Sequence, residues 1–192
     1  MTDWPVELRG VTESVTTTLG PNDRWNVAAL GVRAPESEAP ATARTWGRTR
    51  TWRNFRERGE GYVQFTPDPV DFVEAACSVR EVDQPVLDSA DAWVRASVER
   101  IDSGADAGTE WVEWALRPVA AAVERERPFA PNRAYYAVVE ATVAASRLDV
   151  DGYETASLRD RIDFFETVVA SCGGERERAA WDRFEALVDW RG

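Results

Sequence analysis

The sequence predicts an α+β protein in which a β-rich part, residues 1–128, precedes a helical extension, residues 129–192. Two observations lead to this prediction. In the first part, short runs rich in Val, Thr and Trp are separated by turn residues such as Gly, Pro and Asn, as is typical of antiparallel strands. After Pro128, apolar residues recur at helical spacing in three successive segments.

The β-rich part begins with a predicted hairpin. Leu8–Thr18 is rich in Val and Thr, Gly20–Asp23 is a turn cluster, and Trp25–Arg33 is the returning strand. The centre of the returning strand carries small residues, namely Ala28, Ala29 and Gly31. Small residues in a strand often mark close approach by a ligand or another backbone. The alternative is that they fit a crowded barrel interior.

A cationic, hydroxyl-rich segment follows the predicted third strand, Ala41–Gly47. Its polar members are Arg48, Thr49, Arg50, Thr51 and Asn54. Arginines, hydroxyl and amide donors, and a helix amino terminus are what a phosphate group needs. We expect Thr51 to be the N-cap of a short helix, Trp52–Arg58, that stops at Gly59. The segment is therefore a candidate anion site, whereas Arg56 and Arg58 fit a solvated helix face.

The rest of the β-rich part mixes strands with one helix. We predict a strand at Tyr62–Thr66, a helix at Val70–Val79 and a polar connection at Glu81–Ser89. Two longer strands follow, Ala92–Ile101 and Thr109–Arg127, and Pro118 marks a bulge or an edge in the second. A helix starting at Pro118 is the alternative, because Pro suits a first helical turn and three alanines follow shortly after.

Three amphipathic helices are expected in the extension. They are Arg133–Arg147, capped by Asn132, then Ser157–Cys172, and last Glu175–Arg191. We expect their apolar stripes to pack against one another and against the β-rich part. Docking of a partner protein on these stripes is the alternative.

The composition limits the classes of function. Acidic side chains number 34 against 23 basic ones, all of them Arg, for a net charge of −11. An acidic, Lys-free surface resembles that of proteins from salt-loving archaea, and it argues against nucleic-acid binding. No apolar run approaches the length of a membrane span, and the first residues do not resemble a signal peptide. The sequence thus predicts a cytoplasmic protein without membrane or nucleic-acid partners.

The chain contains no His, which removes Ser-His-Asp and Cys-His catalysis and most zinc sites. Its two cysteines, Cys77 and Cys172, are not in a metal or redox spacing, and we expect both to be buried. We therefore predict no metal site and assign no catalytic residue. Any chemistry would come from a bound cofactor.

Four segments, in this order, resemble a known family: Thr12–Thr18, Asn26–Gly31, Gly47–Thr51 with Asn54, and Tyr62–Pro69. The sequence is similar to an uncharacterised archaeal family of haloarchaeal type that has the FMN-binding split β-barrel fold and is related to flavin reductases and pyridoxamine phosphate oxidases. The resemblance covers about the first two-thirds of the chain, and the helical tail is similar to the family's C-terminal extension. It implies an antiparallel Greek-key barrel.

The resemblance also implies a homodimer with an FMN site at or near the subunit interface. The strand matching Asn26–Gly31 would lie along the isoalloxazine ring, and the turn matching Arg48–Thr51, with Asn54, would hold the phosphate. The sequence departs from the family where Ala28-Ala29 replaces Ala-Pro and Gln64 replaces Asn. The implied cofactor-binding residues are Thr16, Asn26, Ala28, Ala29, Gly31, Arg48, Thr49, Arg50, Thr51, Asn54 and Gln64.

The function expected from the resemblance is that of an FMN-binding flavoprotein, an oxidoreductase of flavin reductase type. Two alternatives remain open at this point: the barrel binds a deazaflavin, or it is a non-catalytic flavin-binding or assembly protein. Four tryptophans are candidates for lining the ring, Trp46, Trp93, Trp111 and Trp114, although a Trp is more often part of a core.

Overall fold

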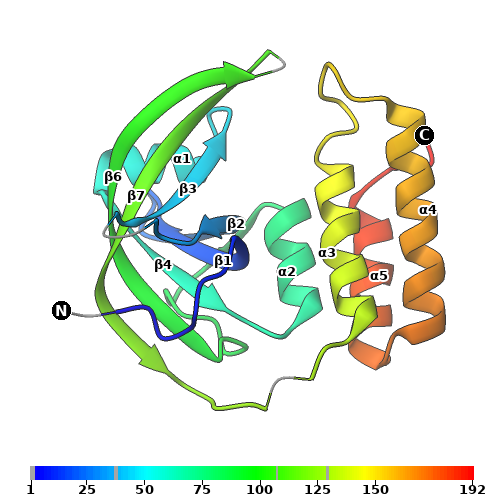
Figure 1. The fold of residues 1–192 in the computed structure, drawn as a ribbon, viewed down its shortest axis with the longest axis horizontal. Coiled ribbons are helices and arrows are strands. Elements are labelled where there is room, and N and C mark those ends of the chain that lie inside the picture. Colours follow the sequence, from blue (N-terminus) through cyan, green and yellow to red (C-terminus); the bar gives the residue numbers. More distant parts are fainter. Residues whose placement is uncertain (1–2, 37–38, 107, 129) are drawn as a thin grey trace. The chain divides into compact units, whose positions relative to one another are not determined.

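The computed structural model describes residues 3–36, 39–106, 108–128 and 130–192. The chain forms two compact units, coloured by sequence in Figure 1. A β unit consists of Met1–Pro67 and Val79–Arg127, and a helical unit consists of Asp68–Ser78 and Pro128–Gly192. The helix Pro69–Cys77, which the sequence analysis included in the β-rich part, therefore belongs to the helical unit.

An antiparallel barrel of six strands forms the β unit, which confirms the predicted fold class. In spatial order the strands run β1, β4, β6, β7, β3, β2, and pairing of β2 with β1 closes the barrel. A seventh strand, β5, lies beside β2. The bounds are β1 Val11–Leu19, β2 Trp25–Arg33, β3 Ala41–Trp46, β4 Glu60–Phe65, β5 Arg80–Val82, β6 Ala92–Asp106 and β7 Thr109–Val123.

The barrel interior is packed with the inward residues of alternate strand positions. Leu30 and Val32 of β2 meet Val94 of β6 and Leu116 of β7 there, and all four are buried. The short helix α1, Arg50–Arg58, adds Phe55, whose ring lies 5.5 Å from that of Trp114 in an edge-on contact. Because α1 contributes a core residue, its position is fixed by barrel packing.

Pro118 lies at a bulge in β7, so the helical alternative from Pro118 is wrong. Ala96 of β6 is opposite Pro118, whereas the preceding Arg95 is opposite Ala120, and the register therefore skips Val119. A proline cannot donate to a strand ladder, and a bulge is a position that tolerates it. The alanines after Pro118 remain in the strand because Trp93, Val94 and Arg95 of β6 pair with them.

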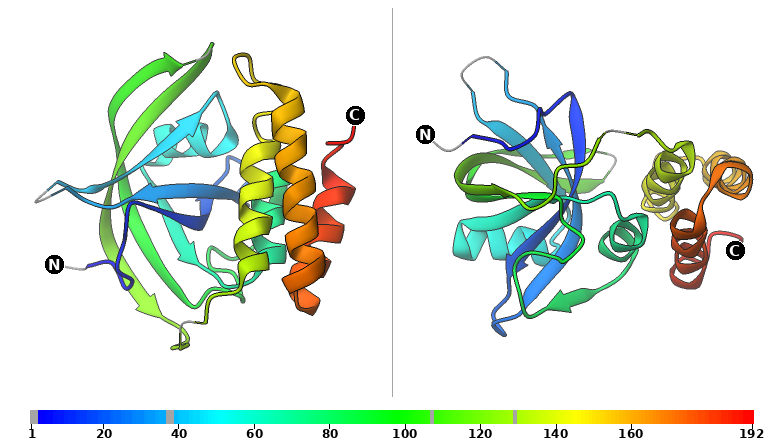
Figure 2. Two further views of the ribbon diagram at one scale, coloured as in Figure 1. Left: turned by 45° about the vertical axis from the view of Figure 1, so that its right-hand side comes forward. Right: turned by 90° about the horizontal axis from the view of Figure 1, so that it is seen from below.

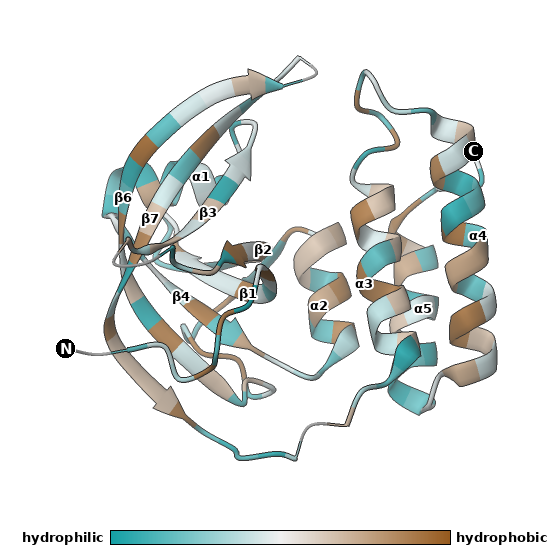
Figure 3. Cartoon of the chain, viewed as in Figure 1, coloured by the Kyte–Doolittle hydropathy of each residue, from teal (hydrophilic) through white to brown (hydrophobic). Residues whose placement is uncertain are grey.

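Two strands differ from their expected extents. The connection predicted at Glu81–Ser89 begins with β5, which pairs with Trp25–Val27 of β2 and is too short to give an alternating pattern. β6 continues beyond Ile101 to Asp106, because β7 pairs with it up to the hairpin end. Hydrophobic and hydrophilic residues follow one another along β6 and β7 in Figure 3.

The helical unit packs four helices side by side, as Figures 1 and 2 show. They are α2 Pro69–Cys77, α3 Arg133–Ala145, α4 Thr155–Cys172 and α5 Glu175–Leu187. Val73, Val138, Ile162 and Phe184, one from each helix, are fully or almost fully buried in one core. The predicted cap of α3 is confirmed, because the Asn132 side chain accepts a hydrogen bond of 2.8 Å from the Ala134 backbone.

The last helix ends at Leu187 and not at Arg191. Val188 has an extended backbone, and Trp190 beyond it is buried in the same core, so the chain leaves the helix to place this indole. Within the described ranges, no helix is both long and apolar enough for a membrane crossing.

Candidate functional site

The cationic segment forms a turn and the first turn of α1. Gly47 has φ 68°, and Thr49 is the N-cap, since its hydroxyl accepts a hydrogen bond of 3.2 Å from the Trp52 backbone. The expected N-cap at Thr51 is therefore wrong: the helix starts at Arg50, two residues earlier than expected. The predicted stop is confirmed, because Gly59 caps the helix in the left-handed conformation.

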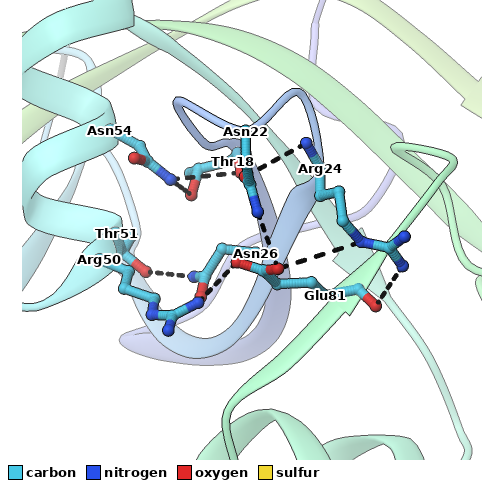
Figure 4. A network of polar contacts seen from close by, with 8 residues as sticks. All are labelled: Thr18, Asn22, Arg24, Asn26, Arg50, Thr51, Asn54 and Glu81. Carbon is cyan, nitrogen blue, oxygen red and sulfur yellow. Dashed lines mark hydrogen bonds and ion pairs between the residues drawn. The ribbon is translucent and has the colours of Figure 1, made fainter.

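Two polar side chains of α1 are buried against the β1–β2 hairpin (Figure 4). The Asn26 amide of β2 donates to the Thr51 hydroxyl at 3.4 Å. The Asn54 amide donates to the hydroxyl and the backbone carbonyl of Thr18, at 3.0 and 3.3 Å. The Asn54 carbonyl oxygen is buried and has no hydrogen-bond partner within the described residues. It is thus an acceptor that a bound donor can satisfy.

The two arginines of the segment extend to different strands. Arg50 contacts Glu81 of β5, with 2.5 Å between guanidinium nitrogen and carboxylate oxygen. Arg48 contacts Glu110 of β7, beside the carboxyl end of β3, with 3.5 Å between the two groups. The arginines that are neighbours in the sequence are therefore held by carboxylates of two different strands, β7 and β5.

Glu81 is the centre of the polar network in Figure 4. Besides Arg50, its carboxylate accepts a hydrogen bond of 3.0 Å from the Asn22 amide and lies 4.0 Å from the Arg24 guanidinium. Sequence reasoning missed this residue because it was assigned to a polar connection. Its role becomes visible only in the structure, where the pairing of β5 with β2 places Glu81 opposite Asn26.

The middle of β2 has an edge without a second strand. On the side away from β1, Trp25–Val27 pair with β5 and Val32–Arg33 pair with β3. The residues between them, 28–31, have a pairing only with β1 in the described structure. We call this interval the β2 gap.

The small residues predicted to face a ligand lie in the β2 gap. Ala28 and Ala29 are half-buried, and the fully buried Thr16 of β1 is opposite Ala28. Gly31 has a different reason to be small: a Cβ there would lie 2.8 Å from a methyl group of Val11. Part of the pattern thus fits the crowded-packing alternative, while Ala28 and Ala29 add only a methyl group each beside the strand edge that has no second strand.

Gln64 is completely buried, and its amide is satisfied by the protein. Its nitrogen donates to the Pro85 carbonyl at 2.9 Å and to the Thr17 hydroxyl at 3.2 Å. Its oxygen accepts from the Leu87 backbone at 2.7 Å. These bonds attach the loop after β5 to the barrel, and the predicted contact of Gln64 with a cofactor stays a prediction.

The buried polar side chains of the described residues are hydroxyls and amides, without a charged group among them. The described residues also contain no group of three or more His, Cys, Asp or Glu that could hold a metal ion. One titratable group with a large shift is Cys77 in the helical unit, where burial, with Glu74 as the smaller cause, raises the pKa of the thiol to about 11. The site can therefore bind and orient a molecule, but it offers no buried acid or base.

Of the tryptophan candidates, Trp114 is a core residue, with its indole N–H donating to the Thr45 hydroxyl at 2.9 Å. Trp46 is half exposed. Trp111 lies on the outer face, under the guanidinium of Arg44 at 4.3 Å from the ring centre.

Comparison with known proteins agrees with this architecture. The chain is similar over 95% of its length to an FMN-bound protein from Methanosarcina mazei, with 25% identity, 97% of that chain covered and a TM-score of 0.77. Two more distant structures also match. The styrene monooxygenase flavin reductase from Pseudomonas putida S12 has 14% identity, 62% and 83% coverage of the two chains and a TM-score of 0.44. Component B of nitrilotriacetate monooxygenase from Bacillus cereus has 14% identity, 60% and 70% coverage and a TM-score of 0.46.

A search of curated proteins found no match. Two family models match consecutive parts of the chain. Residues 12–125 match the model described as "Protein of unknown function (DUF447) N-terminal domain", and residues 132–186 match "Protein of unknown function (DUF447)". The Methanosarcina protein is assigned to the same family. The chain therefore belongs to the DUF447 family.

Proposed function

We propose that the chain binds FMN and acts as an oxidoreductase of flavin reductase type. The observation that carries the proposal is the β2 gap, a strand edge without a second strand that begins beside the first turn of α1. The similarity to an FMN-bound member of the same family supports it.

The amino end of α1 fits a phosphate group. Thr49, Arg50 and Thr51 provide hydroxyls and a guanidinium, and the first turn contains no acidic residue to oppose an anion. Free backbone N–H groups and the helix dipole add to this preference. The carboxylate of Glu81 competes with the phosphate for Arg50, because the two groups would bind the same guanidinium.

The β2 gap fits the flat ring system. Asn26 contacts Thr51 of α1. Ala29 lies three residues farther along β2, which is about 10 Å from Asn26 in an extended strand. This separation suits the ribityl chain that joins the phosphate of FMN to its ring. Backbone groups of residues 28–31 that meet no second strand are available to hydrogen-bond the ring edge, and the methyl side chains of Ala28 and Ala29 allow its approach. Asn54 offers its unpartnered oxygen as an additional acceptor.

When bound, FMN supplies the group that accepts and releases a hydride or electrons. The protein's part is to bind the phosphate, orient the ring against the strand edge and keep both in place. We assign no general acid or base, because the buried polar side chains of the described residues are all uncharged hydroxyls and amides.

The first test is the absorption spectrum of the protein purified in concentrated salt, followed by titration with FMN. A colourless protein that takes up no FMN would overturn the proposal. Mass spectrometry of the released ligand distinguishes FMN from a deazaflavin. Absence of turnover with reduced nicotinamides, in a protein that does bind FMN, would favour a non-catalytic flavin-binding role over the oxidoreductase.

The second test uses variants of the phosphate site. Arg50→Ala should weaken FMN binding by about 1.5–3 kcal/mol, the value of one charge-assisted hydrogen bond. Arg56→Ala is the matched control, since Arg56 is an exposed residue of the last turn that pairs with the adjacent Glu57. Glu81→Gln should strengthen binding, because it removes the competing carboxylate. If all three variants bind FMN with the affinity of the wild type, the phosphate binds elsewhere.

We also propose a homodimer with the cofactor site at or near the interface, as the family resemblance implies. Sedimentation or light scattering with and without FMN tests this. A monomer at all concentrations that nevertheless binds FMN would refute the dimer and leave the FMN proposal intact.

A further inference from the structure

A cavity of about 230 Å³ lies in the β unit beside Arg48. Gly47, Arg48 and Trp52 form one wall of it. The opposite wall comes from the long β6–β7 hairpin and consists of Arg100, Ser103, Gly104, Glu110, Trp111 and Val112. Arg48 is the one lining residue that also belongs to the predicted phosphate segment, whereas Arg50 contacts Glu81 of β5.

Two indoles line the cavity, and each is already held by an arginine. The guanidinium of Arg44 lies 4.3 Å from the ring centre of Trp111, and that of Arg56 lies 4.6 Å from that of Trp52. Such cation–π contacts fix the orientation of a ring. The cavity therefore has aromatic walls in defined positions, which suit offset or edge-to-face packing of another flat ring.

Gly104 makes the position of Trp111 possible. The two residues are opposite each other across β6 and β7, and a Cβ on Gly104 would lie 2.7 Å and 2.9 Å from two indole carbons. Any other residue would push the indole away from the β6 backbone. The glycine thus lets Trp111 lie close against the neighbouring strand.

The polar groups of the cavity favour an anion. Arg48 and Arg100 contribute two positive charges, and Glu110 contributes one negative charge, so the lining is net positive in a chain of net charge −11. The Arg100 guanidinium is oriented by a 2.6 Å hydrogen bond to the Ser103 hydroxyl. Arg48 shares its charge with Glu110 at 3.5 Å, with both side chains largely exposed and free to rearrange.

From these contacts we infer that the cavity is a second binding site, separate from the proposed FMN site, for a small aromatic anion. The volume is below the range of about 300–1,000 Å³ typical of sites for drug-sized ligands, so the ligand has one ring or two fused rings. Its ring packs against the indoles of Trp111 and Trp52 on the sides that their arginines leave open, and its carboxylate or other anionic group binds Arg100 and Arg48.

Ligand-observed NMR and calorimetry with benzoate and 2-naphthoate as probes test this inference. Two matched compounds separate the contributions: benzamide keeps the ring without the charge, and cyclohexanecarboxylate keeps the charge without the aromatic face. We expect at least one aromatic carboxylate to bind, and both matched compounds to bind more weakly. Absence of binding by either aromatic carboxylate, or equal binding of cyclohexanecarboxylate, would overturn the inference.

Variants locate the site. Arg100→Gln, on the exposed hairpin, should weaken binding of the probe about tenfold, as expected for loss of one charge-assisted hydrogen bond. Trp111→Leu should weaken it as well. Arg117→Gln is the control, because Arg117 is also exposed on β7 but pairs with Glu99 outside the cavity. Unchanged affinity in Arg100→Gln and Trp111→Leu would refute the assignment.

The same titrations in the presence of FMN separate this inference from the proposed function. We expect benzoate affinity to be the same with and without FMN, and FMN affinity to be the same in Arg100→Gln and in the wild type. If FMN displaces benzoate, the cavity is part of the flavin site and the inference of a separate site is wrong. Failure of FMN to bind would refute the proposed function and leave the aromatic-anion site standing.

Discussion

Replacing Gln64 by Leu tests whether this residue serves the fold or the cofactor. Leu has a similar volume, so packing is largely kept and the hydrogen bonds are lost. The Leu87 backbone N–H, buried and 2.7 Å from the Gln64 oxygen, would lose its acceptor. The Pro85 carbonyl would keep a second donor, the Thr17 hydroxyl at 2.5 Å. The damage is therefore concentrated on one buried donor.

The expected cost follows from these contacts. An unsatisfied buried donor costs about 1–3 kcal/mol, and each remaining lost hydrogen bond costs about 0.5–1.5 kcal/mol. We expect the free energy of unfolding of Gln64→Leu to fall by about 2–6 kcal/mol. Denaturant unfolding at constant salt, followed by tryptophan fluorescence and circular dichroism, measures it.

Gln84→Leu is the matched control, since Gln84 is an exposed residue of the same loop. It should change stability by no more than about 0.5 kcal/mol. If Gln64→Leu is also within that range, the three hydrogen bonds do not hold the loop and the reasoning fails. If it is fully stable but binds FMN much more weakly than the wild type, the role implied by the family resemblance is the correct one.

Other predictions concern single contacts. Thr49→Ala should lower the free energy of unfolding by about 1 kcal/mol through loss of the α1 cap, measured by denaturant unfolding. Gly59→Ala should cost about 1–2 kcal/mol in the same assay, because the residue has φ 64°. The Cys77 thiol, with its pKa raised to about 11, should react with iodoacetamide at pH 9 more slowly in the folded than in the unfolded chain. The unfolded thiol ionises near pH 9.0 and the folded thiol near pH 11. The free energy of unfolding should therefore be unaffected by this group below pH 9 and should fall between pH 9 and pH 11, by at most about 2.7 kcal/mol. In Cys77→Ala this fall should be absent.

Features set by local chemistry were predictable from the sequence. The β1–β2 hairpin follows from a Val/Thr-rich run and a turn cluster, and the caps at Gly59 and Asn132 follow from residue types that favour those positions. Family resemblance added the barrel, which local patterns alone do not specify. The short helix was also expected, although its start was placed too late because two threonines two residues apart are equally good caps.

Features set by contacts between distant residues were not predictable in the same way. β5 has three residues and exists because β2 offers it an edge, so no alternation within the segment could indicate it. The buried contacts of Gln64 depend on a loop more than 20 positions later, which the sequence shows only as polar. Likewise, α2 lies between strands in the sequence, but its Val73 is buried in the core of the helical unit.

The two arginines show why clustering in sequence is a weak guide to clustering in space. Arg48 and Arg50 are separated by one residue, but Thr49 between them is the cap at which extended backbone changes to helix. Their side chains consequently extend to Glu110 of β7 and to Glu81 of β5, two different strands. A comparison of Arg48→Ala with Arg50→Ala resolves their roles: the proposals require Arg50→Ala to affect FMN more than benzoate, and Arg48→Ala to affect benzoate. If both variants weaken FMN alone, the segment acts as one phosphate site, as its sequence suggests.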